Sequence, residues 1–172
     1  MKKIKLLLCL FMLTTLCGCS NSNKNESSKT LNAAMFWIST SLDPTNNYDG
    51  WVLSRIGVGE TLLKLNEKYE VEPSLAKSYE QIDDTTWKLT LKDHITFSNG
   101  NKVTGENVKA CLERAFEKNT RAIDYFDLNH VEADKQDVYL YLNKSSGAIL
   151  NNLCEPLFTI YDASQSEVDI AK

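Results

Sequence analysis

The middle of the chain alternates apolar and polar residues with a period of two, the pattern of strands that bury one face. Residues 61–73, TLLKLNEKYEVEP, predict two strands around a central turn. The alternation is clearest where Trp87, Leu89 and Leu91 are separated by polar residues. Residues 131–143, VEADKQDVYLYLN, predict a further hairpin. The central region is therefore expected to form antiparallel sheet.

A spacing of three and four residues predicts one long helix between these strands. Thr104 is its expected N-cap. Its apolar stripe consists of Val108, Cys111, Leu112, Ala115 and Phe116. Shorter helices are predicted at residues 51–57, with Asp49 as cap, near 121–128, and at 147–153.

Two compact apolar runs, residues 31–38 and 156–162, predict buried strands at the beginning and the end of the folded part. Strands and helices do not alternate as regular βαβ units along the chain. The order of elements therefore predicts a mixed α/β fold of the α+β type.

The first twenty residues have the three parts of an export signal. Three lysines come first, the apolar run 6–16 follows, and small and sulfur-bearing residues end it. The run is shorter than the ~20 residues that a membrane-spanning helix needs; a retained single-pass anchor is the rival interpretation. The order Leu16-Cys17-Gly18-Cys19 resembles the lipobox of bacterial lipoproteins. It predicts cleavage after Gly18 and lipidation of Cys19, whereas a metal-binding Cys-x-Cys lacks further ligands nearby.

Three segments follow from this reading of the chain. Residues 1–18 are a lipoprotein signal peptide, and residues 19–30 are a flexible tether without large apolar side chains. Residues 31–172 are the folded part. The predicted location is the extracytoplasmic face of the cell membrane, where the lipid on Cys19 is the only membrane attachment.

Charge and composition exclude several classes of function. Removal of residues 1–18 takes away three lysines and no acids, so the formal net charge changes from −4 to −7. An acidic surface of this kind argues against nucleic-acid binding. The two histidines, His94 and His130, have no further ligands at recognisable spacing, and phosphate-loop and nucleophile-elbow motifs are absent. We therefore expect no enzyme, no catalytic residue, no metal site and no cofactor.

Two cysteines of the folded part leave an alternative open. Cys111 and Cys154 pair as a disulfide or are two buried small apolar residues, and the sequence favours the second. The loop after the first predicted strand is the candidate binding region. It gathers Trp37, Tyr48, Trp51 and Arg55, and loops on a rigid scaffold commonly carry binding residues. Core packing is the competing role for Trp37.

Several segments resemble the bacterial family 5 extracellular solute-binding proteins, the receptors of peptide and nickel ABC importers. Residues 73–100 carry most of this resemblance, which extends over about residues 31–161. The matching segments are LDP (42–44), GETLLKL (59–65), VEPSLAKSYE (71–80), TTWKLTLKDHITFSNG (85–100) and the V-x-x-x-L-x-R helix after it.

The resemblance implies a receptor that binds a small solute, either a peptide or nickel or another metal chelate. The receptor hands the solute to ABC permease subunits in the membrane without catalysis. It also implies a two-lobed fold of the periplasmic-binding-protein type II class. Family members are far longer than 172 residues, so the match to their N-terminal portion predicts a partial first lobe and a missing second lobe. The rival hypothesis is a stand-alone small surface lipoprotein with a structural or protein-interaction role.

The resemblance also places ligand contacts, by position, at residues 47–51, at Asp124 and Tyr125, and at Glu155. With Arg55 from the aromatic loop, the predicted ligand-binding residues are Asn47, Tyr48, Trp51, Arg55, Asp124, Tyr125 and Glu155. In the nickel-binding branch the last position is an arginine that meets an anionic chelate. An acid in its place favours a cationic or amine-bearing ligand, unless Glu155 is only a surface acid beside a proline.

Overall fold

The computed structural model describes Asn32, Ala34 and residues 41–164. The chain divides into two units, residues 1–34 and 35–172, and the fold reported below is that of the second unit. The predicted signal peptide, Cys19, most of the predicted strand 31–38 and Trp37 lie outside the described residues.

A four-stranded antiparallel sheet in the order β3-β4-β6-β5 forms the centre of this unit. Its strands are β3 (Ala76–Gln81), β4 (Thr86–Leu91), β5 (Leu128–Asp134) and β6 (Asp137–Leu142). In the register of the two central strands, Leu89 pairs with Val138. Leu89, Leu91, Val131, Val138 and Leu140 are fully buried on one face. The period-two alternation therefore predicted the inward face of the sheet correctly.

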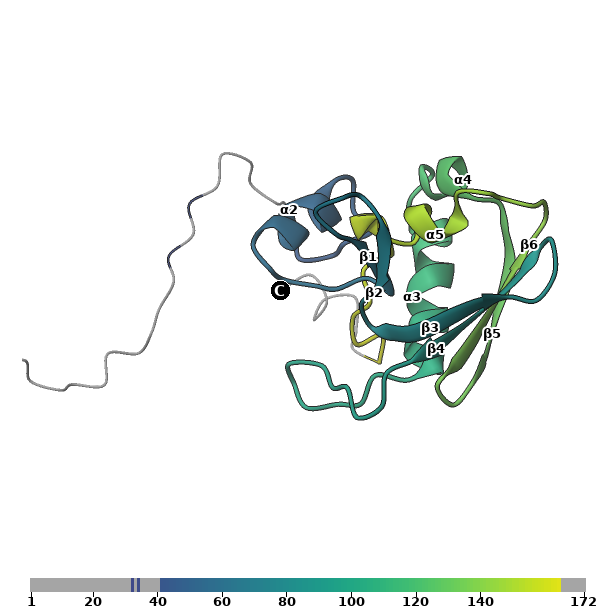
Figure 1. The fold of residues 1–172 in the computed structure, drawn as a ribbon. Coiled ribbons are helices and arrows are strands. Elements are labelled where there is room, and N and C mark those ends of the chain that lie inside the picture. The colour runs from purple at the N-terminus through teal and green to yellow at the C-terminus, as the bar shows by residue number, and fades with distance from the viewer. Residues whose placement is uncertain (1–31, 33, 35–40, 165–172) are drawn as a thin grey trace, which may run out of the picture. The chain divides into compact units, whose positions relative to one another are not determined.

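The long helix α3 (Gly105–Lys118) packs against this apolar face (Figure 1). It begins with a reciprocal cap, in which Asn107 N donates to Thr104 Oγ1 and Thr104 N donates to Asn107 Oδ1. A cap of this kind satisfies backbone donors that the first helical turn leaves open. Val108, Cys111, Leu112 and Ala115 are buried. The predicted N-cap and the predicted apolar stripe are confirmed.

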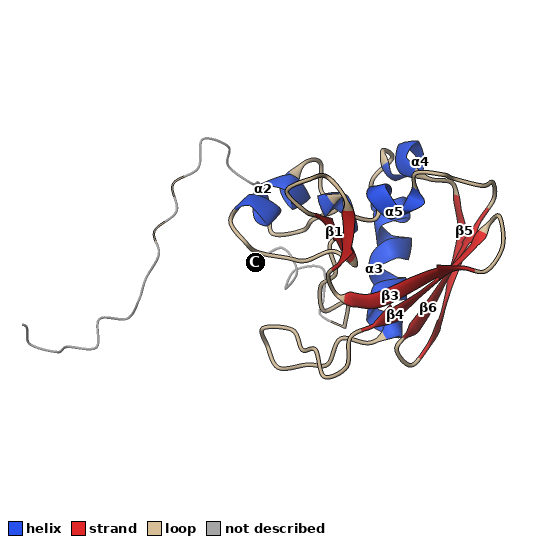
Figure 2. Ribbon diagram, viewed as in Figure 1, coloured by secondary structure: helices blue, strands red, loops and turns tan. Residues whose placement is uncertain are grey.

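Shorter elements complete the unit (Figure 2). They are α2 (Asp49–Arg55), the hairpin β1 (Leu63–Leu65) and β2 (Val71–Pro73), α4 (Ala122–Tyr125), α5 (Ile149–Asn152) and the 3-10 helix η2 (Pro156–Phe158). The predicted first hairpin and three predicted short helices are present, with somewhat different bounds. Strands and helices without βαβ alternation confirm the mixed α/β fold class.

Two predicted elements differ from the structure. The hairpin predicted at 131–143 begins three residues earlier, because strand β5 starts at Leu128. His130 therefore lies in a strand, where its ring stacks on Tyr141 at a centroid distance of 4.3 Å. Residues 156–162 do not form a strand. Pro156 begins a 3-10 helix because its fixed φ suits a first helical position. Within residues 41–164, this segment pairs through a single antiparallel bridge, between Glu60 and Ile160.

The predicted cap of α2 is also wrong. Tyr48 occupies the N-cap position without a side-chain hydrogen bond to the helix, and Asp49 is already in the first turn. The buried Asp49 carboxylate instead accepts hydrogen bonds from Ser41 N, Ser41 Oγ and Asn46 Nδ2. Asp49 thereby closes the 41–48 loop onto the beginning of α2.

Candidate functional site

Three of the predicted ligand-binding residues meet although they are far apart in the sequence. Trp51 comes from α2, Tyr125 from the end of α4 and Glu155 from the turn before η2. The Trp51 indole Nε1 donates a hydrogen bond to Glu155 Oε1. Burial, together with the neighbouring Glu155 carboxylate, raises the pKa of the Tyr125 phenol. Glu155 therefore has two aromatic hydrogen-bonding neighbours, which is more than a surface acid beside a proline would have.

Two arginines border these aromatic side chains. The Arg55 guanidinium lies 5.4 Å from the centre of the Trp51 ring, and that of Arg121 lies 4.2 Å from the centre of the Tyr48 ring. Both distances are typical of cation–π contact. Arg121 also donates from Nη2 to Tyr125 Oη at 3.0 Å. We call this group the aromatic cluster: Tyr48, Trp51, Arg55, Arg121, Tyr125 and Glu155.

The two other predicted residues, Asn47 and Asp124, contact the aromatic cluster through their backbones. Asn47 contributes its backbone carbonyl, which accepts from Arg121 Nη1 at 3.3 Å, while its side chain donates to Asn46. Asp124 is exposed, and its backbone N–H donates to the carbonyl of Arg121. Arg121 is the one cluster residue that the sequence did not predict, because its three partners come together only in the folded chain.

The surface of the cluster is largely open to solvent. The exposed fraction of Tyr48 is 62% and that of Trp51 is 41%. Large aromatic side chains that remain exposed on a rigid scaffold are typical of a binding surface. The ring faces offer stacking surfaces, and the guanidinium groups offer hydrogen-bond donors and positive charge. The Glu155 carboxylate supplies the negative charge.

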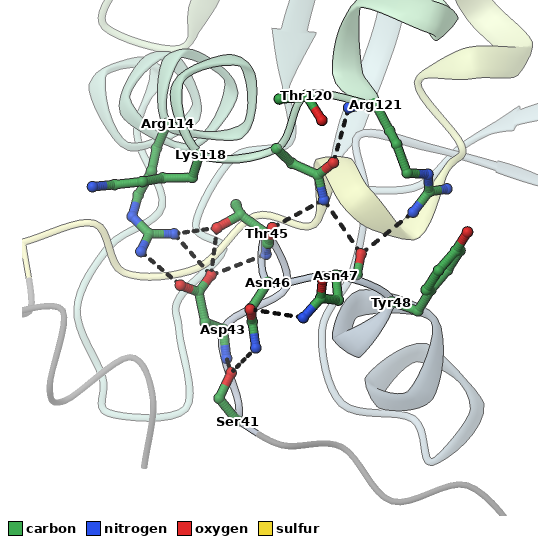
Figure 3. Close-up of a pocket in the computed structure, with 11 residues that line it drawn as sticks. Ser41, Asp43, Thr45, Asn46, Asn47, Tyr48, Arg114, Lys118, Thr120 and Arg121 are labelled. Carbon is green, nitrogen blue, oxygen red and sulfur yellow. Dashed lines mark hydrogen bonds and ion pairs between the residues drawn. The ribbon is translucent and has the colours of Figure 1, made fainter.

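A partly buried ion pair fixes the loop that carries Tyr48. Arg114 of α3 forms a bidentate contact with Asp43, at 2.8 Å from Nη1 to Oδ1 and 2.6 Å from Nη2 to Oδ2, and also bonds Thr45 Oγ1 (Figure 3). Burial alone would raise the pKa of Asp43, but the hydrogen bonds from Arg114 and Thr45 hold it below its usual value. Asp43 belongs to the LDP segment, and Arg114 belongs to the V-x-x-x-L-x-R helix.

A polar pocket of about 550 Å³ lies between the 41–48 loop and the end of α3 (Figure 3). Its lining residues are Ser41, Asp43, Thr45, Asn46, Asn47, Tyr48, Arg114, Lys118, Asn119, Thr120 and Arg121. The buried Asn119 side chain closes its floor by donating to the carbonyls of Thr45 and Asn47. Loop 41–48 is therefore tied to α3 at three successive points, Asp43, Thr45 and Asn47.

Near the C-terminal end of the described residues, the Asp162 carboxylate holds the chain in place through hydrogen bonds. The Asp162 carboxylate accepts from Asn99 Nδ2 and Asn101 Nδ2, which belong to the turn that follows Phe97, and from Ser164. These hydrogen bonds, with those of Ser164 the largest contribution, hold the pKa of Asp162 well below its usual range. The charged form is thus favoured in the folded chain.

The lowered pKa values of Asp43 and Asp162 predict acid sensitivity. A carboxyl group with a lowered folded-state pKa stabilises the fold above its unfolded pKa of ~3.9, and this contribution is lost as the pH falls through the folded value. We expect the urea concentration at the unfolding midpoint to decrease when the pH is lowered below about 4. The midpoint of Asp162→Asn should decrease less steeply in this range. The midpoint of Asp84→Asn, a variant in an exposed turn, should decrease as that of the unsubstituted chain does. Equal pH dependence of Asp162→Asn and the unchanged chain would contradict this role.

The cysteine alternative is settled for the folded part. Cys111 and Cys154 are both free, and Cys111 Sγ donates to the carbonyl of Tyr161 at 3.3 Å. Burial raises the pKa of the Cys111 thiol to about 12 and that of Cys154 to about 11. Both are therefore unreactive thiols at neutral pH.

Across residues 41–164, His, Cys, Asp and Glu side chains do not gather in threes as a metal ion would require. Within the same range, every helix is too short or too polar to cross a bilayer.

Comparison with known proteins gives consistent relatives. The nickel-binding protein NikA of Staphylococcus aureus is 33% identical over 155 residues, which are 90% of this chain and 30% of that protein. The crystal structure of Staphylococcus aureus NikA in complex with Ni(L-His)2 matches with a TM-score of 0.71 and 32% identity, over 77% of this chain and 28% of that chain. A nickel ABC transporter structure from Bacillus halodurans matches with a TM-score of 0.69 and 28% identity, over 74% and 27%.

The chain thus spans less than a third of the length of these relatives, and its fold corresponds to part of a lobe. The family model for bacterial extracellular solute-binding proteins, family 5, middle region, matches residues 70–172. This range begins with the second strand of the first hairpin and includes α3, the central sheet, Tyr125 and Glu155. Since it covers more than half of the chain, the protein belongs to the family 5 bacterial extracellular solute-binding proteins.

Proposed function

We propose that this chain supplies part of the solute-binding surface of a receptor for an ABC importer. The receptor is held at the extracytoplasmic face of the membrane by a lipid on Cys19. The convergence of Trp51, Tyr125 and Glu155 on one exposed surface is the observation that carries the proposal. Relatives whose names describe nickel binding support a small solute of the nickel-chelate or peptide kind.

The charge at Glu155 narrows the class of solute. Its carboxylate accepts from Trp51 and lies beside Tyr125, and Arg121 donates to the hydroxyl of the same tyrosine. An acid and an arginine next to one phenol suit a ligand that carries an amine and a carboxylate. We therefore favour a peptide or an amino-acid chelate over a purely anionic chelate.

The variant Glu155→Gln tests this assignment. The new amide still offers an oxygen to the Trp51 indole but has no charge for an amine. A hydrogen bond to a charged group contributes about 1.5–3 kcal/mol, so affinity should fall about tenfold or more. The measurement is calorimetric titration of the chain with Ni²⁺ and two equivalents of L-histidine, and separately with a tripeptide that has a free amino terminus.

Glu67→Gln is the matched control, because Glu67 is exposed in the turn between β1 and β2. It should leave the affinity for both probes unchanged. If Glu155→Gln also leaves both affinities unchanged, Glu155 does not contact the solute.

A further inference from the structure

Helix α2 approaches the segment after Glu155 unusually closely at Gly50. A Cβ atom added there would lie 2.5 Å from the carbonyl oxygen of Pro156 and 3.0 Å from that of Pro44. Contacts below 3.0 Å essentially never occur for real Cβ atoms, so any side chain at this position would displace backbone. The close approach is a reason for glycine at this position.

The Pro156 carbonyl has little freedom to move away. It accepts hydrogen bonds from Thr159 N at 3.2 Å and from Thr159 Oγ1 at 2.7 Å. At the far end of the same segment, Ile160 N donates to the carbonyl of Glu60 at 2.8 Å. Residues 156–160 are therefore held in place where they contact α2. A side chain at position 50 would displace the helix away from them.

The residues next to this contact are two members of the aromatic cluster that are hydrogen-bonded to each other. Trp51 directly follows Gly50, and Glu155 directly precedes Pro156. The backbone contact between Gly50 and Pro156 thus sets the separation at which the Trp51 indole meets the Glu155 carboxylate. An outward shift of α2 would separate them, because the indole is rigid and Glu155 is anchored through Pro156.

We infer that Gly50 is a positioning residue of the solute-binding surface: by permitting contact between α2 and the Pro156 carbonyl, it holds Trp51 on Glu155. Its relevance to solute capture rests on the proposed function, but the contact between Trp51 and Glu155 is measurable without any solute.

The test uses the indole N–H signals in ¹H–¹⁵N spectra of the folded chain, with Trp51 assigned through Trp51→Phe. Gly50→Ala should move the Trp51 indole signal away from its hydrogen-bonded position and speed its exchange with solvent about tenfold or more. The Trp87 indole, in β4, should keep its position.

Two alanine variants separate positioning from stability. At Gly105, at the beginning of α3, an added Cβ would lie 2.9 Å from the carbonyl oxygen of Lys135, whereas at Gly147 nothing lies within 4 Å. Gly105→Ala should lower the unfolding midpoint as Gly50→Ala does but leave the Trp51 signal in place. Gly147→Ala should change neither.

Thr159→Val covers the case in which Gly50→Ala does not fold. It removes the hydroxyl bond to the Pro156 carbonyl and keeps the shape of the side chain, so Trp51 exchange should accelerate by a smaller factor. An unchanged Trp51 indole in Gly50→Ala, or in Thr159→Val if the former does not fold, overturns the inference. An equal shift in Gly105→Ala also overturns it.

Discussion

Arg114→Ala is expected to lower the free energy of unfolding by about 3 kcal/mol, because it leaves the Asp43 carboxylate partly buried without its partner. The exposed fractions of the two side chains are only 16% and 15%, so water does not readily replace the bidentate contact. Arg114 also bonds Thr45. The loss should therefore release loop 41–48 together with Tyr48, which urea denaturation followed by circular dichroism can measure.

Arg114→Lys is the matched variant for the geometry of this pair. Lysine keeps the charge but not the two parallel N–H groups, so we expect a loss smaller than that of alanine yet clearly measurable. The double variant with Asp43→Ala should cost less than the sum of the single variants, since both remove the same contact. Additive losses would show that Asp43 and Arg114 do not stabilise the fold as a pair.

Phe158→Ala is expected to have an effect of similar or larger size, about 3–5 kcal/mol, as for other buried phenylalanines. The Phe158 ring is 1% exposed and packs against Phe116, Phe126 and Tyr125 at centroid distances of 5.9, 5.1 and 5.7 Å. Its loss would open a cavity beneath the aromatic cluster. Thermal and urea unfolding of the folded chain measure the change.

Ile123→Ala provides the control for Phe158→Ala, because Ile123 lies in α4 beside Tyr125 but is 52% exposed. It should change the free energy of unfolding by no more than about 0.5 kcal/mol. A small effect of Phe158→Ala would mean that the ring is not part of a tightly packed core.

Local signals explain which elements the sequence predicted well. Helix α3 was predicted because its start and its buried face are both encoded nearby, in Thr104 and in a stripe of apolar residues. Strand β4 was predicted for the same kind of reason. The segment 156–162 was not, since its apolar residues suit a strand but Pro156 begins a 3-10 turn. Among the residues that the structure describes, its one bridge partner is Glu60.

The spacing of residues along the sequence could not predict the contacts of the aromatic cluster. Tyr48, Trp51 and Arg55 were singled out by the aromatic loop, whereas Tyr125 and Glu155 came from a family resemblance. The contact between Trp51 and Glu155 joins residues 104 positions apart. Arg121 was missed because its partners, Asn47, Tyr48 and Tyr125, come from two separate segments. Conversely, the structure explains two of the resembling segments, since Asp43 of one forms its ion pair with Arg114 of the other.

The most direct test of the solute-binding surface uses the indole signals of the ¹⁵N-labelled chain. Six-coordinate Ni²⁺ has unpaired electrons and broadens the signals of nearby protons, so Ni²⁺ with two equivalents of L-histidine reports its own position. A diamagnetic tripeptide serves as the second probe and reports through chemical shift. We expect broadening or shift of the Trp51 indole while the Trp87 indole stays unchanged, and loss of this selectivity in Glu155→Gln. Equal effects on Trp51 and Trp87, or no effect of either probe at millimolar concentration, would contradict a solute site at the aromatic cluster.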